Sequence, residues 1–393
     1  MPTDATFLLA GLFIIAAASG WAFERFSRER DNQPPARISA DYIRGLNLVL
    51  NRKTDEALEL FVQIAKVDDD TLETHFALGH LFRRRGEVDR AIRVHQNLLA
   101  RPSLSEAQRH QALFALAEDY LGAGLFDRAE SLFAELTTSS TQSRAALERL
   151  VDIYEREREW EKAIDAHRQL ELRSGERSPR IAHYYCELAE QARVAGDTER
   201  ALECLSNAEQ TDSGALRAAL IRAAIAKGRG ELGRAIRLYE QVVAADRRFI
   251  AEVLPSVMDC YKEDGGLERF DAYVARLVEQ DPSLEKELAY AAIIGDLVES
   301  PELADCVQSF VLSNEVLINL VNADELSPQD PQRRSAAIQR IVRGLRQLAM
   351  SSARYRCTNC GYSAQRLIWH CPSCKLWETV RPVQTFQFGA LVS

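Results

Sequence analysis

A small or apolar residue recurs along this chain every 34 to 38 positions, and this periodicity limits the possible folds more than any other feature. A larger, mostly apolar residue follows three positions after it, and usually an alanine nine positions later, as in Gly79, Phe82 and Ala91. The eight anchors of the pattern are Gly45, Gly79, Ala117, Val151, Ala189, Ala223, Met258 and Ala292. Their spacings of 34, 38, 34, 38, 34, 35 and 34 residues indicate a stack of similar units.

A period of 34 residues is typical of tetratricopeptide repeats, in which each unit is a pair of helices, A and B. Small residues at the anchor and at the alanine would let the two helices approach closely. We expect Phe61, Phe133 and Tyr239, each four residues after its alanine, to fill the groove between them. The sequence therefore predicts an all-α superhelical solenoid with a concave face that suits binding of another protein.

Two departures from the period indicate local changes. The 38-residue intervals coincide with residues 101–103 and 174–179, which we expect to lengthen turns without breaking the stack. The pattern fades after residue 313, and a Pro-containing break over 327–331 precedes one more predicted helix, over 333–350. We predict that the array with this capping helix occupies residues 41–350.

Four cysteines near the C-terminus, Cys357, Cys360, Cys371 and Cys374, form two Cys-x2-Cys pairs ten residues apart. This spacing predicts a small rubredoxin-like or zinc-ribbon-like module over residues 351–393, in which one tetrahedral ion is held by four thiolates. Sulfur ligation suits iron or zinc, and four sulfurs leave no open coordination position, which favours a structural role. Two disulfides are the alternative, and they would require an oxidising compartment.

The other end of the chain predicts the compartment. Residues 5–23 carry no charge and as a helix would span about 28 Å, close to the thickness of a bilayer core. Arg25, Arg28 and Arg30 follow the apolar stretch and no Lys or Arg precedes it, so we expect the rest of the chain in the cytoplasm. A signal peptide would need basic residues before the apolar stretch, where only Asp4 is charged. We predict a transmembrane anchor over 1–24 and a linker over 25–40.

Charge is distributed unevenly along the sequence. From Arg333 to the end there are ten Lys and Arg against Glu378 alone, a net charge of +9, whereas the whole chain carries −9. Residues 1–332 therefore carry −18. An acidic array joined to a basic tail predicts that the metal module docks onto the repeats, although both could equally be solvated surfaces.

Several other motifs carry less weight. The sequence from Gly228 to Gly233 matches G-x-G-x-x-G but falls in a turn between two predicted helices, where nucleotide binding lacks its strand. His370, beside Cys371, could ligate a metal, but four cysteines already complete the coordination. Four further cysteines have no ligand spacing and are expected to be packing residues: Cys186, Cys204, Cys260 and Cys306.

The aromatic and basic residues of the C-terminal module allow a further alternative. They could stack RNA bases, as in other small cysteine-based modules. Membrane tethering and overall acidity disfavour this reading, and we expect no nucleic-acid partner. The residues concerned are Arg354, Tyr355, Arg356, Tyr362, Trp369 and Trp377.

The combination of one predicted span, a tetratricopeptide array and a C-terminal pair of cysteine knuckles resembles the lipopolysaccharide assembly protein B family of Gram-negative bacteria. The resemblance is strongest over residues 81–96, 354–362 and 369–374. It implies a single-pass inner-membrane protein without catalytic residues, whose soluble part lies in the cytoplasm. It also implies an adaptor that assists the membrane protease FtsH in degrading the lipid A deacetylase LpxC, and that answers to an inner-membrane signalling protein.

Two other functions remain open at this stage. A scaffold that gathers lipopolysaccharide synthesis and transport components would use the same concave surface. An electron-transfer protein would use a rubredoxin-type iron reversibly, although the ten residues between the knuckles leave little chain to enclose a tuned redox site.

Overall fold

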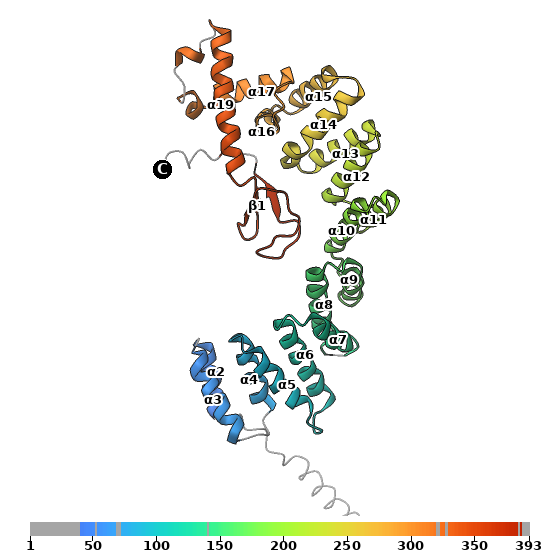
Figure 1. Ribbon diagram of the computed structural model, residues 1–393, viewed down its shortest axis with the longest axis vertical. Coiled ribbons are helices and arrows are strands. Elements are labelled where there is room, and N and C mark those ends of the chain that lie inside the picture. Colours follow the sequence, from blue (N-terminus) through green and yellow to red (C-terminus); the bar gives the residue numbers. More distant parts are fainter. Residues whose placement is uncertain are drawn as a thin grey trace, which may run out of the picture. The chain divides into compact units, whose positions relative to one another are not determined.

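The computed structural model describes residues 40–51, 53–67, 72–139, 141–319, 323–326, 329–383 and 386 (Figure 1). Within these residues, no helix is both long and apolar enough to cross a membrane. The anchor expected at residues 5–23 lies outside the described part of the chain. Contacts divide the chain into two compact units, Met1–Ile153 (unit 1) and Tyr154–Ser393 (unit 2).

Unit 1 consists of paired helices, and its last helix, α8, continues into unit 2. The helices are α2 (Ala40–Leu50), α3 (Thr54–Val67), α4 (Leu72–Arg84), α5 (Val88–Leu99), α6 (Glu106–Gly122), α7 (Phe126–Leu136) and α8 (Ser143–Glu157).

Unit 2 continues the pairs and ends in a small sheet, which in Figure 1 follows the C-terminal end of α19. Its repeat helices are α9 (Trp160–Ser174), α10 (Arg180–Val194), α11 (Thr198–Thr211), α12 (Leu216–Gly228), α13 (Leu232–Ala245), α14 (Ile250–Asp264), α15 (Leu267–Gln280), α16 (Glu285–Gly295) and α17 (Pro301–Ser313). The remaining elements are α18 (Glu315–Ile318), α19 (Pro331–Ser351), the short 3-10 helices η1 (Arg247–Phe249), η2 (Pro282–Leu284) and η3 (Ala323–Leu326), and strands β1 (Tyr355–Cys357), β2 (Ser363–Ala364) and β3 (Val380–Pro382).

The repeat register predicted from the sequence is confirmed by these bounds. Each of the eight anchors lies in the first helix of a pair, and the residue twelve positions later lies in the second. The two longer intervals fall between α5 and α6 and between α9 and α10, as expected for lengthened turns. The G-x-G-x-x-G match falls at the turn between α12 and α13, so the strand that a dinucleotide site needs is not there.

Small anchors are required because aromatic rings of the partner helix lie against them. A Cβ atom added at Gly45 would lie 2.6 Å from the Phe61 ring, and one at Gly79 would lie 2.4 Å from the His95 ring. The His95 ring is fixed in turn by the buried carboxylate of Asp119, which also accepts a 2.6 Å hydrogen bond from Arg83 Nη1. Close helix approach at the anchors is therefore confirmed in unit 1.

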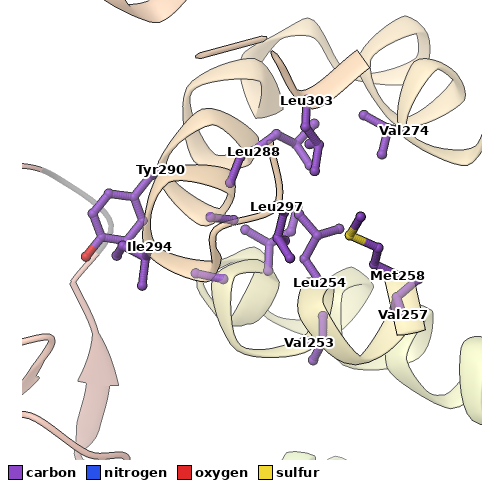
Figure 2. Close-up of a cluster of buried hydrophobic side chains, with 14 of the residues drawn as sticks. Val253, Leu254, Val257, Met258, Val274, Leu288, Tyr290, Ile294, Leu297 and Leu303 are labelled. Carbon is purple, nitrogen blue, oxygen red and sulfur yellow. The ribbon is translucent and has the colours of Figure 1, made fainter. Parts of the chain in front are cut away.

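The core of unit 2 is continuous from α12 to α19. Figure 2 shows Leu254 and Met258 of α14 directed toward Leu288 of α16 and Leu303 of α17, all buried. The four cysteines outside the C-terminal pairs are buried in helices, as predicted, and burial raises the pKa of each thiol. They act as small apolar packing residues.

The C-terminal helix α19 caps this core. It begins where Pro331 occupies the first turn and the Asp330 carboxylate accepts a 3.0 Å hydrogen bond from the backbone N–H of Arg333. The prediction of a helix over 333–350 is confirmed with a difference of two residues at the N-terminal end and one at the C-terminal end. Its Ile338, Ile341 and Leu345 side chains are part of the core. The helix ends at Ser351, and β1 begins at Tyr355.

Candidate metal centre

A three-stranded antiparallel sheet in the order β2-β1-β3 frames the four C-terminal cysteines. Cys357 ends β1 and is paired in register with Val380 of β3, while Arg356 is paired with Ser363 of β2. Cys360 and Cys371 lie in the turns that leave and rejoin this sheet.

The two Cys-x2-Cys turns have the same backbone hydrogen-bond pattern. The N–H of Cys357 donates to the Tyr362 carbonyl at 2.7 Å, and the N–H of Gly361 donates to the Cys357 carbonyl at 3.0 Å. In the second turn, Cys371 donates to Leu376 at 3.0 Å and Lys375 donates to Cys371 at 2.9 Å. Both turns therefore place two sulfurs in the same local geometry.

The four sulfurs lie close together. All are within 4.8 Å of one another, Cys357 Sγ lies 3.7 Å from Cys374 Sγ, and Cys360 Sγ lies 3.6 Å from Cys371 Sγ. A tetrahedral ion with metal–sulfur bonds of about 2.3 Å requires sulfurs about 3.8 Å apart, whereas a disulfide requires about 2.0 Å. The cluster can hold one metal ion, and its spacing does not match the disulfide alternative.

Proton affinity differs between the cysteines because their surroundings differ. The hydrogen bond between the Cys357 thiol and the Thr379 hydroxyl, 3.3 Å long, helps lower the pKa of Cys357 to about 6. Burial instead raises the pKa of Cys371 to about 11. A metal binds thiolates, so Cys357 is close to its binding form at neutral pH while Cys371 must lose a proton.

His370 does not join the sulfurs. Its Nε2 lies 3.1 Å from the Lys375 carbonyl, and its ring stacks on Trp377 with centroids 4.5 Å apart. The expectation that His370 is not needed as a ligand agrees with this geometry. The His370 ring instead packs between the second cysteine turn and Trp377.

Trp377 inserts into an aromatic cage formed by the repeats. Its ring lies 5.2 Å from His183, 5.7 Å from Tyr184 and 6.1 Å from Trp160, and it is only 8% exposed. The indole N–H donates a 2.8 Å hydrogen bond to the carboxylate of Glu155. The surrounding rings therefore bury the apolar part of Trp377, and Glu155 provides a hydrogen-bond acceptor for its indole N–H.

Trp369 and Phe386 extend the contact along the array. The Trp369 ring stacks on Phe249 with centroids 5.8 Å apart and an interplanar angle of 6°. Phe386 meets Tyr290 edge-on at 4.9 Å and lies 5.9 Å from Phe310. The repeat residues that receive the module come mostly from the first helices of the pairs.

Ionic groups complete the docking. Glu252 accepts hydrogen bonds from the Tyr355 hydroxyl and, at 3.1 Å, from Arg354. Glu378 lies 3.6 Å from His183 and 3.1 Å from Arg381, and these neighbours lower the pKa of its carboxyl. The predicted docking of the basic tail on the acidic repeats is confirmed, and ring contacts of Trp369, Trp377 and Phe386 join the charged pairs in making it.

Comparison with known proteins agrees with both parts of the architecture. Residues 355–382 match the family model of the rubredoxin metal binding domain, and residues 74–106 and 114–179 match tetratricopeptide repeat models. Lipopolysaccharide assembly protein B of Escherichia coli strain K12 is 34% identical over 386 residues, covering 96% of this chain and 98% of that protein. The chain belongs to the lipopolysaccharide assembly protein B family.

Another member, from Haemophilus influenzae, is 31% identical over 388 residues, again covering 96% of this chain and 98% of its own length. A crystal structure of MamA protein is 18% identical, covers 43% of this chain and 88% of its own, and superposes with a TM-score of 0.33.

For this member of the lipopolysaccharide assembly protein B family, the sequence indicated the four cysteines but not the residues that receive their module. His183, Phe249, Glu252 and Glu155 are single residues on helices, with no motif to mark them. The tryptophans considered for base stacking are used internally, since Trp377 and Trp369 pack on the repeats.

Proposed function

We propose that this chain is a membrane-anchored, non-catalytic adaptor in lipopolysaccharide assembly. The observation that carries the proposal is that the side chains next to the cysteines, Trp369, His370 and Trp377, are all engaged in packing the module. A module used in this way fixes the end of a binding array. The name of the relatives, lipopolysaccharide assembly protein B, supplies the pathway.

We assign Cys357, Cys360, Cys371 and Cys374 as ligands of one iron or zinc ion. When bound, the ion would cross-link the two cysteine turns, with no position left open for a substrate. The chain's own contribution is to hold the sulfurs at ligand spacing and to seat the second turn on the repeats.

The register of the repeats indicates where a client would bind. In unit 2, residues six before an anchor (His183, Glu252) and four after one (Glu155) contact the metal module. The same positions in unit 1 are occupied by Glu73, Gln111, Arg83 and Leu121 on α4 and α6. We propose that the client binds the face of unit 1 formed by these residues of α4 and α6. The half-buried Phe76 of α4 and Phe114 of α6 belong to the same face.

We propose that the client is the lipid A deacetylase LpxC and that the recipient is the membrane protease FtsH, with an inner-membrane signalling protein controlling the delivery. A span over residues 5–23 would keep the array beside the membrane protease. A scaffold for lipopolysaccharide synthesis and transport components is the competing function.

The test is to deplete the protein and follow the half-life of the deacetylase after synthesis is blocked. A longer half-life supports the adaptor, whereas an unchanged half-life favours the scaffold. In parallel, Cys357→Ser is expected to lose metal and the ability to restore deacetylase turnover. The matched control is Cys204→Ser, at a buried cysteine in α11 outside the cluster, which should keep both.

A further inference from the structure

The first helix of the array exposes an apolar face. Ile43, Leu46 and Leu50 follow one another at spacings of three and four residues along α2 and are 49%, 40% and 79% exposed. These spacings place the three side chains on one side of the helix. Leu48 and Val49 lie on the other side and pack against the core of the first repeats.

An apolar face is unusual at the end of a solenoid. Terminal units need a polar outer surface to stay soluble, and three exposed apolar side chains on one side of the first described helix depart from this rule. Contiguous apolar side chains at a protein surface usually mark a site of interaction with a protein or a membrane. The α2 face is therefore expected to be covered.

The net charge of the sequence that precedes and includes α2 indicates what covers this face. Residues 24–53 contain seven Lys and Arg and four Asp and Glu, a net charge of +3 in a chain of −9. Apolar side chains flanked by positive charge are the pattern of a helix that lies in the interface of an anionic membrane.

Chain length permits the contact. The anchor proposed above ends at residue 23 and α2 begins at Ala40, so 16 residues separate them. Such a segment can span at most about 55 Å. Helix α2 is thus confined near the bilayer surface, where even a weak preference for lipid would be satisfied.

We propose that the face of α2 formed by Ile43, Leu46 and Leu50 rests in the headgroup region of an anionic bilayer and fixes the orientation of the first repeats. This inference depends on the anchor in the proposed function. It adds a second membrane contact that is made by the folded array itself.

The test uses the full chain reconstituted in vesicles of phosphatidylethanolamine and phosphatidylglycerol. A fluorescent amino acid is introduced at position 50 or, as the control, at position 41, where Asp41 is exposed on the opposite side of α2. Quenching by a headgroup-level nitroxide lipid is expected to be at least about threefold stronger at position 50. The double substitution Ile43→Gln/Leu46→Gln should reduce quenching at position 50 to the control level without changing helicity.

Flotation of the vesicles distinguishes the two proposals. Protein that floats with the vesicles but shows equal quenching at positions 41 and 50 would overturn the α2 contact and leave the anchor intact. Protein that does not float would overturn both. Equal quenching in neutral phosphatidylcholine vesicles, or cross-linking of position 50 to a second copy in place of lipid, would overturn the assignment to anionic lipid.

Discussion

Two equivalent residues of the cysteine turns differ in backbone cost. Gly361 has φ of 76° in the first turn, and Lys375 has φ of 59° at the same place in the second. A non-glycine residue in this left-handed region costs about 1 kcal/mol or more. Because Lys375→Gly also loosens the unfolded chain, we expect a net gain of only about 0.5 kcal/mol in module stability. Slower release of metal to a chelator would measure it.

The reverse substitution is the matched control. Gly361→Ala meets no heavy atom within 4 Å, so any loss is conformational and should reach about 1–2 kcal/mol. If Gly361→Ala releases metal no faster than the unmodified protein, the two turns are not equivalent in energy.

A buried histidine gives unit 2 a dependence on pH. Burial first, and the nearby charge of Arg180 second, lower the pKa of His167 from 6.5 to about 4. Between pH 6.5 and pH 4, His167 is protonated in the unfolded chain but remains neutral in the folded chain. The free energy of unfolding therefore falls as pH decreases from 6.5 toward 4. The shift of about 2.5 units limits the loss to roughly 3 kcal/mol.

His167→Gln removes this titration. The measurement is the free energy of unfolding in urea of His167→Gln and of the unmodified protein between pH 4 and 7. The difference between the two free energies should change with pH. Arg180→Gln removes a positive charge near His167, so the pKa of His167 in the folded protein should rise. A parallel pH dependence for His167→Gln and the unmodified protein would contradict the assignment.

At the scale of elements, Trp377 joins the metal module to α8 and α10. Trp377→Ala removes a buried ring and its hydrogen bond, and should weaken docking by about 3–5 kcal/mol. Trp377→Phe keeps an aromatic ring and should cost about 1–2 kcal/mol, because Glu155 still accepts a 2.6 Å hydrogen bond from Tyr184. Faster amide exchange of α10 would report the undocking.

Metal content separates docking from folding of the module. Both variants should retain the metal, since Trp377 is not a ligand and the sulfurs are held by β1, β3 and the two turns. Loss of the metal in Trp377→Ala would mean that the ring holds the second turn together and does not merely seat it.

Sequence and structure agree for the helices and disagree in detail for the docking, for a physical reason. Helix pairs follow from local periodicity, since Gly79 and its alanine partner Ala91 are only twelve residues apart. The contact between Trp377 and Glu155 joins residues 222 apart and leaves no repeating pattern. Net charge predicted that the tail would dock, but it could not select Phe249 for Trp369, because stacking carries no charge signal.

At the scale of the whole molecule, removing the metal with a chelator should undock the C-terminal module without unfolding the repeats. Removing the ion from the four sulfurs is expected to release Trp369 and Trp377 to water, while the repeat helices retain their own buried core. Tryptophan emission should therefore shift to longer wavelength while far-ultraviolet circular dichroism loses no more than about a tenth of its signal. Adding zinc or iron should restore the emission, and cooperative loss of helicity on chelation would show instead that the ion organises the array.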